Sequence, residues 1–267
     1  MIGKNRVTFD SSAGADDVEI MSGAVPYRDF LRRVHQELSP RFYVEIGVRQ
    51  GRSLALAGCK AVGIDPCPEI AVPLPAETLI YRETSDDFFN RDGGSTFLGR
   101  VDLAFIDGMH LIEYALRDFM NIERRAHAAS VVVFDDIFPN HPVQAERRRQ
   151  SRVWTGDIWK IISCLRTHRP ELLLLPIDTY PTGLLLVAGL DPGNQQLGRE
   201  YGHIVEELTK EPRQPVPARI LERRGAVAPD DPRVADILGM LRKTRESCEG
   251  NLTPGEGLLT RHAVFNT

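Results

Sequence analysis

Short apolar runs that alternate with helical patterns constrain the fold of this chain more than any other feature of its sequence. Near-continuous apolar strands separated by helices indicate a parallel sheet that is covered on both faces. Two later runs, at 171–175 and 183–188, are joined by a short connection containing Pro and Gly, and they predict an antiparallel hairpin at one edge. We therefore expect an α/β fold with a sheet of about seven strands. The first five runs lie at 42–47, 61–65, 78–81, 101–107 and 131–136.

The segments between the strands, and those that flank them, show helical spacing of apolar residues. The predicted helices occupy residues 27–38, 52–59, 112–125 and 153–167. After residue 191 the composition becomes more polar, and two polar helices are predicted at 194–211 and 230–248, with a Pro-rich linker between them. We expect the last 18 residues to be poorly ordered. The chain divides into a flexible leader at 1–26, a main domain at 27–191 and a partly disordered C-terminal helical extension at 192–267.

Composition excludes several classes of protein. The formal net charge of −4 and the pI of about 6.0 argue against a dedicated nucleic-acid-binding protein. The four cysteines form no C-x2-C pair, so we expect reduced thiols. The most apolar stretch, 172–190, is interrupted by Pro176, Asp178 and Pro181, and no membrane span is expected. The first residues lack an apolar run, which favours a cytoplasmic protein. The sequence leaves open whether the protein forms a homo-oligomer.

The first strand runs into a glycine turn with an acid before it. Gly47 and Gly51 allow a tight turn and a close approach to a ligand, while Glu45 suits a cationic, amino-acid-like group better than a phosphate. Ser53 closes the motif. Arg49 stands where the pyrophosphate-binding G-x-G-x-x-G motif has glycine, so that motif is incomplete. The alternative is an ordinary strand-to-helix turn.

The next two strands end in residues that fit a nucleoside. Asp65 ends the second strand, where an acid can accept hydrogen bonds from both ribose hydroxyls. Ser85 and Asp86 follow the third strand, where a turn would contact adenine. Each of these residues is equally suited to a turn or a helix cap. Together with the glycine turn, they favour a nucleoside cofactor without pyrophosphate.

Three acids follow the fourth and fifth strands. Asp107 ends one, and Asp135 and Asp136 end the other. If the strands are neighbours, these carboxylates converge, and a divalent cation would remove their mutual repulsion. Oxygen ligands suit Mg²⁺, Mn²⁺ or Ca²⁺ rather than Zn²⁺. The alternative is that these acids cap helices or pair with arginines.

His110 and two tryptophans are the remaining candidates. His110 is a general base for a hydroxyl, a metal ligand or a helix cap. The arginine-rich stretch 147–152 and the segment with Trp154, Trp159 and Lys160 form either a solvated face or a wall for a sugar ring or an anionic group.

These motifs resemble a class I S-adenosylmethionine-dependent methyltransferase, in the branch that includes metal-dependent sugar O-methyltransferases and cephalosporin-hydroxylase-like proteins. The resemblance covers about residues 27–190 and implies a Rossmann-like sheet with a reversed last strand. It implies that Glu45, Gly47 and Gly51 line the methionine end of the cofactor and Asp65 its ribose, and that Asp107, Asp135 and Asp136 hold Mg²⁺. The matching residues are Glu-Ile-Gly-Val-x-x-Gly-x-Ser at 45–53, Gly-Ile-Asp at 63–65, Phe-Ile-Asp-Gly-Met-His-x-x-Glu-Tyr-x-Leu-Arg-Asp at 105–118 and Val-Phe-Asp-Asp at 133–136.

The chain departs from this branch at two places. Catechol-type enzymes have Asp-Asn where this chain has Asp135-Asp136, and the sugar enzymes carry a second acid where this chain has Met109. We therefore assign the base role to His110. The resulting hypothesis is a Mg²⁺- or Mn²⁺-dependent O-methyltransferase that acts on a sugar or another small-molecule hydroxyl.

Three other hypotheses compete with this one. A non-haem iron oxygenase needs a second histidine at a matching strand end, and the sequence has none there. A dinucleotide-dependent oxidoreductase would need the missing third glycine. A non-catalytic binding or assembly protein that keeps the fold stays open, because a fold alone does not establish a function.

Overall fold

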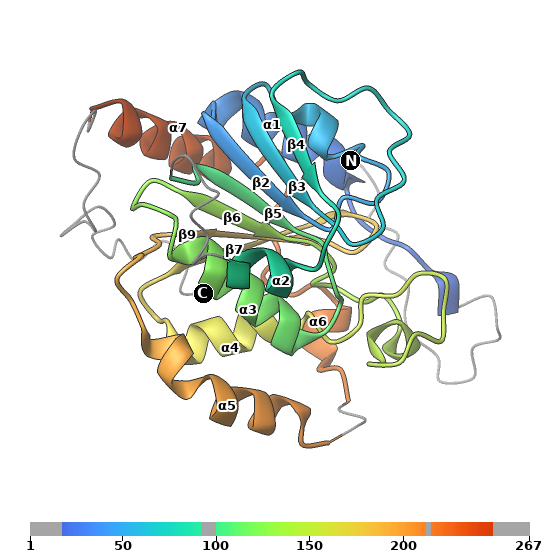
Figure 1. Ribbon diagram of the computed structural model, residues 1–267. Helices are drawn as coiled ribbons and strands as arrows, with labels where there is room; N and C mark the ends of the chain where they lie inside the picture. Colours follow the sequence, from blue (N-terminus) through green and yellow to red (C-terminus); the bar gives the residue numbers. More distant parts are fainter. Residues whose placement is uncertain (1–17, 92–99, 212–214, 248–267) are drawn as a thin grey trace.

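A seven-stranded sheet runs through the centre of the computed structural model, which describes residues 18–91, 100–211 and 215–247 (Figure 1). Its spatial order is β4-β3-β2-β5-β6-β9-β7. The first five strands are mutually parallel, and β9 is antiparallel to both β6 and β7. The predicted fold class, with its reversed last strand, is confirmed. The strands are β2 (Phe42–Ile46), β3 (Lys60–Ile64), β4 (Thr78–Tyr81), β5 (Leu103–Ile106), β6 (Val131–Phe134), β7 (Leu173–Ile177) and β9 (Leu184–Ala188).

Helices cover both faces of the sheet (Figure 1). One face carries α1 (Tyr27–Leu38), the 3₁₀ turn η2 (Leu54–Leu56) and α7 (Pro232–Ser247). The other face carries the remaining helices, and a 3₁₀ turn, η4 (Pro142–Ala145), follows β6. These helices are α2 (Ser85–Asn90), α3 (Ile112–Glu123), α4 (Lys160–His168), α5 (Gln196–Thr209) and α6 (Ala218–Leu221).

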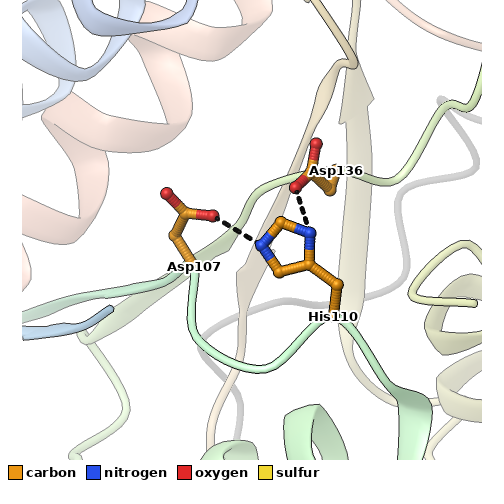
Figure 2. A group of neighbouring side chains, drawn as sticks. All are labelled: Asp107, His110 and Asp136. Carbon is orange, nitrogen blue, oxygen red and sulfur yellow. Dashed lines mark ion pairs between the residues drawn. The ribbon is translucent and has the colours of Figure 1, made fainter. Parts of the chain in front are cut away.

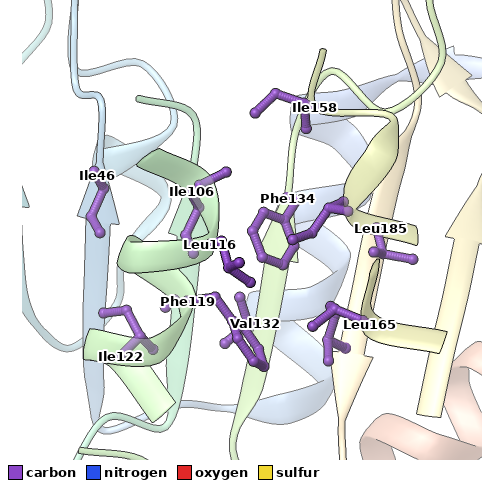
Figure 3. Close-up of a cluster of buried hydrophobic side chains, with 14 of the residues drawn as sticks. Ile46, Ile106, Leu116, Phe119, Ile122, Val132, Phe134, Ile158, Leu165 and Leu185 are labelled. Carbon is purple, nitrogen blue, oxygen red and sulfur yellow. The ribbon is translucent and has the colours of Figure 1, made fainter. Parts of the chain in front are cut away.

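Alternate residues of each central strand belong to two separate cores. In β5, Ala104 and Ile106 join the core under α3 and α4, while Leu103 and Phe105 join the core under α1 and α7. Figure 3 shows the first of these cores, in which α3 packs on β2, β5 and β6. Because both faces are buried, neither side of a strand needs polar residues, and the strands read as continuous apolar runs.

Part of the predicted leader and the C-terminal extension pack onto this domain. Val25–Pro26 (β1) pairs with Thr179–Tyr180 (β8), and Gln144 Nε2 donates hydrogen bonds to the carbonyls of Val18 and Ile20. Residues 18–26 are therefore not a loose leader. The extension supplies α5, α6 and α7, whose apolar residues complete the two cores. The rest of the leader, 1–17, and the last part of the extension, 248–267, lie outside the described residues.

Two helical predictions need correction. The helix expected at 153–167 begins only at Lys160, because Gly156 takes a positive φ of 55° and the chain turns there. The one expected at 52–59 is reduced to the 3₁₀ turn η2.

Cys59, Cys67 and Cys164 are free thiols, and Cys248 lies outside the described residues. Among the described residues, none of the helices has the length and apolar character that crossing a membrane requires.

Candidate active site

The predicted functional residues follow neighbouring parallel strands at the same edge of the sheet. β2 pairs with both β3 and β5, and β5 pairs with β6, so their carboxyl ends lie in register. Gly47, Asp65, Asp107 and Asp135 are the first residues after these four strands. An open α/β sheet binds its ligands at this edge, where the strand order reverses.

The glycine turn after β2 packs directly on the end of β5. Gly47 has a φ of 87°, and a Cβ at this position would lie 1.9 Å from the carbonyl oxygen of Asp107. Only glycine therefore fits there. Arg49, with a φ of 47°, also takes the left-handed conformation, which a longer side chain adopts at a cost. The turn that would hold a cofactor thus touches the acid that would face the substrate.

Glu45 lies beneath this turn and is completely buried. Its carboxylate accepts hydrogen bonds from Tyr43 Oη and Ser53 Oγ, both at 2.7 Å. Burial raises the pKa of Glu45 to about 8, although these two hydrogen bonds favour the ionised form. Ser53 therefore orients Glu45, and Tyr43 is a structural residue of the same network. A cationic ligand group at this place would favour the carboxylate.

Asp65 holds the glycine turn by its backbone. Its Oδ2 accepts the N–H groups of Val48 and Arg49 at 2.9 and 2.7 Å, and its Oδ1 accepts that of Cys67 at 2.7 Å. The side chain is fixed at the strand end, and its oxygens keep further lone pairs. The ribose contact of Asp65 stays a prediction.

The predicted adenine residues lie at the start of α2 and are tied to α3. Asp86 accepts two hydrogen bonds from Arg117, at 2.8 and 2.6 Å. Asp118, the last residue of the matching segment 105–118 and predicted only as part of a salt-bridged helix face, is 2% exposed beside Ser85, and burial raises its pKa to about 7. Its signal in the sequence is weak, because an acid one position after Arg117 reads as part of a solvated helix face. The role of Ser85 and Asp86 stays a prediction.

Asp107, His110 and Asp136 come together at the ends of β5 and β6 (Figure 2). Asp107 Oδ1 lies 3.5 Å from His110 Nε2, and Asp136 Oδ2 lies 2.9 Å from His110 Nδ1. One potential ligand atom from each residue lies within 4.8 Å of the other two. The predicted trio contained Asp135 in place of His110. Asp136 has a positive φ of 61°, which turns it toward His110, and Asp135 instead accepts the Asp136 N–H at 2.8 Å.

The charges of this cluster are poorly compensated. Burial raises the pKa values of Asp107 and Asp135, and the charge of Asp136 raises both further. Burial disfavours protonation of His110, but Asp136 and Asp107 outweigh it and raise the pKa of the imidazole well above its usual range. Tyr27, for which the sequence pattern indicates only a place at the start of a helix, is also affected by these charges. Burial raises the pKa of its hydroxyl, and Asp135 and Asp107 raise it further.

The structure separates the three candidate substrate residues. Trp154 stacks on His110 with 5.1 Å between the ring centroids. Trp159 is only 7% exposed, and Lys160 only 2%. The ammonium group of Lys160 donates to Asp157 and to the carbonyl of Leu208, at 2.9 and 2.6 Å. Because α4 begins at Lys160 and packs on the core, the side chains of Trp159 and Lys160 are both buried, and this burial does not favour their predicted contact with a substrate.

The predicted arginine cluster is partly an internal ion-pair network. Arg147 contacts both carboxylate oxygens of Glu113, at 2.5 and 3.0 Å, and Asp157 at 2.7 Å. Arg152 is exposed, as a solvated face requires. The interpretation as a solvated face therefore holds for Arg152, and neither interpretation included the ion pairs of Arg147. The wall for a sugar ring or an anionic group stays a prediction.

Residues 44–137 match the family model described as "Methyltransferase domain". A cofactor-bound structure of Rv0187 from MTB is similar at 19% identity, covers 65% of this chain and 85% of its own, and has a TM-score of 0.49. The O-methyltransferase from Bacillus cereus in complex with SAH has 14% identity, coverages of 65% and 86%, and a TM-score of 0.46. The O-methyltransferase TomG from Streptomyces achromogenes, in complex with SAM, has 14% identity, coverages of 64% and 82%, and a TM-score of 0.46. No curated protein matches the chain.

Proposed function

We propose that this chain, whose residues 44–137 match the model of a methyltransferase domain, is a class I S-adenosylmethionine-dependent methyltransferase that transfers the methyl group to a hydroxyl of a sugar or another small molecule. The observation that carries this proposal is the contact between two parts of the site. The glycine turn at Gly47 lies against the backbone of Asp107, whose side chain faces His110. A methyl donor on the turn and a hydroxyl beside His110 would therefore be neighbours, and much of the rate would come from this positioning.

The cofactor would lie along the carboxyl ends of β2, β3 and β4. Glu45, Gly47, Gly51 and Ser53 would line its methionine end. Asp65 would face the ribose. Ser85 and Asp86 would lie near the adenine. The rigid hydrogen bonds of Glu45 and Asp65 support this arrangement, because they hold the turn in place before a ligand arrives.

The acids at the ends of β5 and β6 fit a divalent cation. Asp107 and Asp136 each present a carboxylate oxygen toward the imidazole of His110, these ligand atoms lie within 4.8 Å of one another, and Asp135 adds a buried acid beside them. Oxygen donors with uncompensated charge suit Mg²⁺ or Mn²⁺. A bound cation would supply Lewis-acid chemistry that lowers the pKa of the acceptor hydroxyl.

His110 would take the proton from that hydroxyl. Its imidazole lies between the two acids, so it borders the place where the acceptor would be held. The negative charges of Asp107 and Asp136 favour the protonated imidazolium. A positive charge that compensates them would lower the pKa of His110, and its neutral imidazole could then act as a base. The alternative, in which the imidazole is itself a metal ligand, would make methyl transfer depend on metals that prefer nitrogen donors.

Thermal unfolding followed by a methyl-transfer assay tests the proposal. S-adenosylhomocysteine at 100 times its Kd should stabilise the protein by about 2.7 kcal/mol, which corresponds to a shift of about 5–10 °C. Mg²⁺ should give a second shift that EDTA reverses. Transfer of a labelled methyl group is then measured with a catechol and with a set of methyl pyranosides. A cofactor shift without methylation of any hydroxyl would favour the non-catalytic binding protein.

A further inference from the structure

Trp154 holds the imidazole of His110 in two ways. The two rings are stacked, with 5.1 Å between their centroids and an angle of 10° between their planes. The carbonyl oxygen of Trp154 also lies 2.8 Å from His110 Nδ1. A carbonyl oxygen only accepts hydrogen bonds, so Nδ1 must carry a proton, which faces both this oxygen and the carboxylate of Asp136 at 2.9 Å. Nε2 is then the ring nitrogen directed at Asp107.

The segment that contains Trp154 is also fixed to the backbone of His110. The N–H of Asp157 donates to the carbonyl of His110 at 3.2 Å. Gly156, with a φ of 55°, leaves no room there, because a Cβ at this position would lie 1.7 Å from the same carbonyl oxygen. The indole N–H of Trp154 donates to the carbonyl of Glu146 at 2.6 Å. The indole is therefore held both by its stacking on His110 and by the hydrogen bond of its N–H group.

A buried ion-pair network anchors this segment to the protein. Asp157 accepts the N–H of Ile112, at the start of α3, at 2.8 Å. Its second oxygen pairs with Arg147 at 2.7 Å and with Lys160 at 2.9 Å. Because Asp157 is 2% exposed, water competes little for these contacts. The network fixes Trp154 relative to α3 and the end of β5.

We propose that Trp154 is a positioning residue, whose ring and carbonyl oxygen keep His110 oriented between Asp107 and Asp136. The inference rests on the proposed function for its catalytic meaning, but the orientation can be measured without a substrate. Ring planarity is what the stack requires, so Trp154→Phe should preserve the orientation and Trp154→Ala should lose it.

The ring N–H protons of His110 provide the test. Imidazole protons that are held in hydrogen bonds exchange slowly with water and give proton NMR resonances downfield of the amides. Those that disappear in His110→Gln belong to His110. We expect the same resonances to be lost or broadened in Trp154→Ala and retained in Trp154→Phe. Their persistence in Trp154→Ala, or their absence from the wild-type protein, would overturn the proposal.

Two controls separate positioning from a general loss of structure. His127 Nε2 lies 2.7 Å from Asp102 in a buried pair. Asp102 precedes β5, at the opposite end of this strand from Asp107, so the ring resonance of His127 should be unchanged in every variant. Trp159→Phe alters the other tryptophan, whose side chain is buried in the core under α3 and α4, and should leave the His110 resonances in place.

The methyl-transfer assay then separates the two proposals. With a catechol or pyranoside that is turned over, kcat should fall about 10- to 100-fold in Trp154→Ala and recover to within about threefold of wild type in Trp154→Phe. The KM for S-adenosylmethionine should stay unchanged. If no hydroxyl is methylated but the NMR result holds, the positioning stands and the proposed function fails.

Discussion

Substitution of Asp107 or Asp136 should lower the rate of methyl transfer without lowering the affinity for the cofactor. Asp107→Asn and Asp136→Asn remove charge from the cluster around His110 but leave the glycine turn and Asp65 untouched. We expect methyl transfer to fall by at least about 100-fold, with the thermal shift on S-adenosylhomocysteine preserved. Turnover assays and thermal unfolding of both variants check this. A loss of cofactor affinity in either variant would contradict the separation of the two roles.

His35 should make the protein sensitive to mild acid. It is 8% exposed, its ring lies edge-on to Tyr43, and neither ring nitrogen has a hydrogen-bond partner among the described residues. Burial lowers its pKa to about 4, whereas an unfolded histidine titrates near 6.5. Between these two values the unfolded chain binds more protons, so stability is lost as the pH falls from about 6.5 to 4.

The loss from His35 should amount to about 3 kcal/mol over that range. Urea unfolding at several pH values measures it, and His35→Phe should flatten the dependence between pH 6.5 and 4. The surface residue His203 is a suitable control, because it is exposed and His203→Phe should leave the dependence unchanged. An unaltered pH profile in His35→Phe would show that another group causes the acid sensitivity.

Among the helices, α7 offers a direct measure of what the extension contributes. Leu238 is completely buried against the face that α1 covers, and Arg245 donates to the carbonyls of Leu38 and Ser39 at the end of α1. Leu238→Ala should lower the free energy of unfolding by about 2–4 kcal/mol through the cavity that it leaves. Met240→Ala, two residues further on and 38% exposed, should change it by less than about 0.5 kcal/mol. Equal effects of the two substitutions would mean that α7 is not docked in solution.

The same elements show which features a sequence can predict. α1 spans Tyr27–Leu38 as expected, because its apolar residues follow one helical stripe and Ser39 ends it in a left-handed conformation. The strands were predictable because burial on both faces leaves continuous apolar runs. Residues 153–159 were not, because their path depends on contacts with His110 that are distant in sequence.

For the site, the sequence was enough to predict which strand ends meet, but not which side chains form the cluster. Topology brings Asp107 and Asp136 together, and the spacing of strand ends was enough to anticipate it. The exchange of Asp135 for His110 in the cluster depends on the positive φ of Asp136, which no spacing reveals. The burial of Lys160 depends on a single partner, Asp157, and on where α4 begins.

At the scale of the whole molecule, the predicted boundary at residue 191 should not give an independent domain. Leu197 and Ile204 of α5 belong to the core under α3 and α4, and Val234 and Leu241 of α7 belong to the core under α1. A fragment ending at residue 191 would expose both faces. We expect it to bind a hydrophobic dye strongly and to lose near-ultraviolet circular dichroism while keeping most of its far-ultraviolet signal. Cooperative unfolding of this fragment, with a normal shift on S-adenosylhomocysteine, would contradict this expectation.

The position of β9 also sets the order in which the protein can be completed on the ribosome. β9 is the last strand of the large sheet along the chain, yet it lies between β6 and β7. Until residues 184–188 emerge, one edge of β6 is unpaired and can recruit strands from other nascent chains. The apolar face beside α1 stays exposed for longer, because α7, which covers it, ends only at Ser247. Chaperones that shield exposed apolar surface would therefore be needed until Ser247 has left the ribosome.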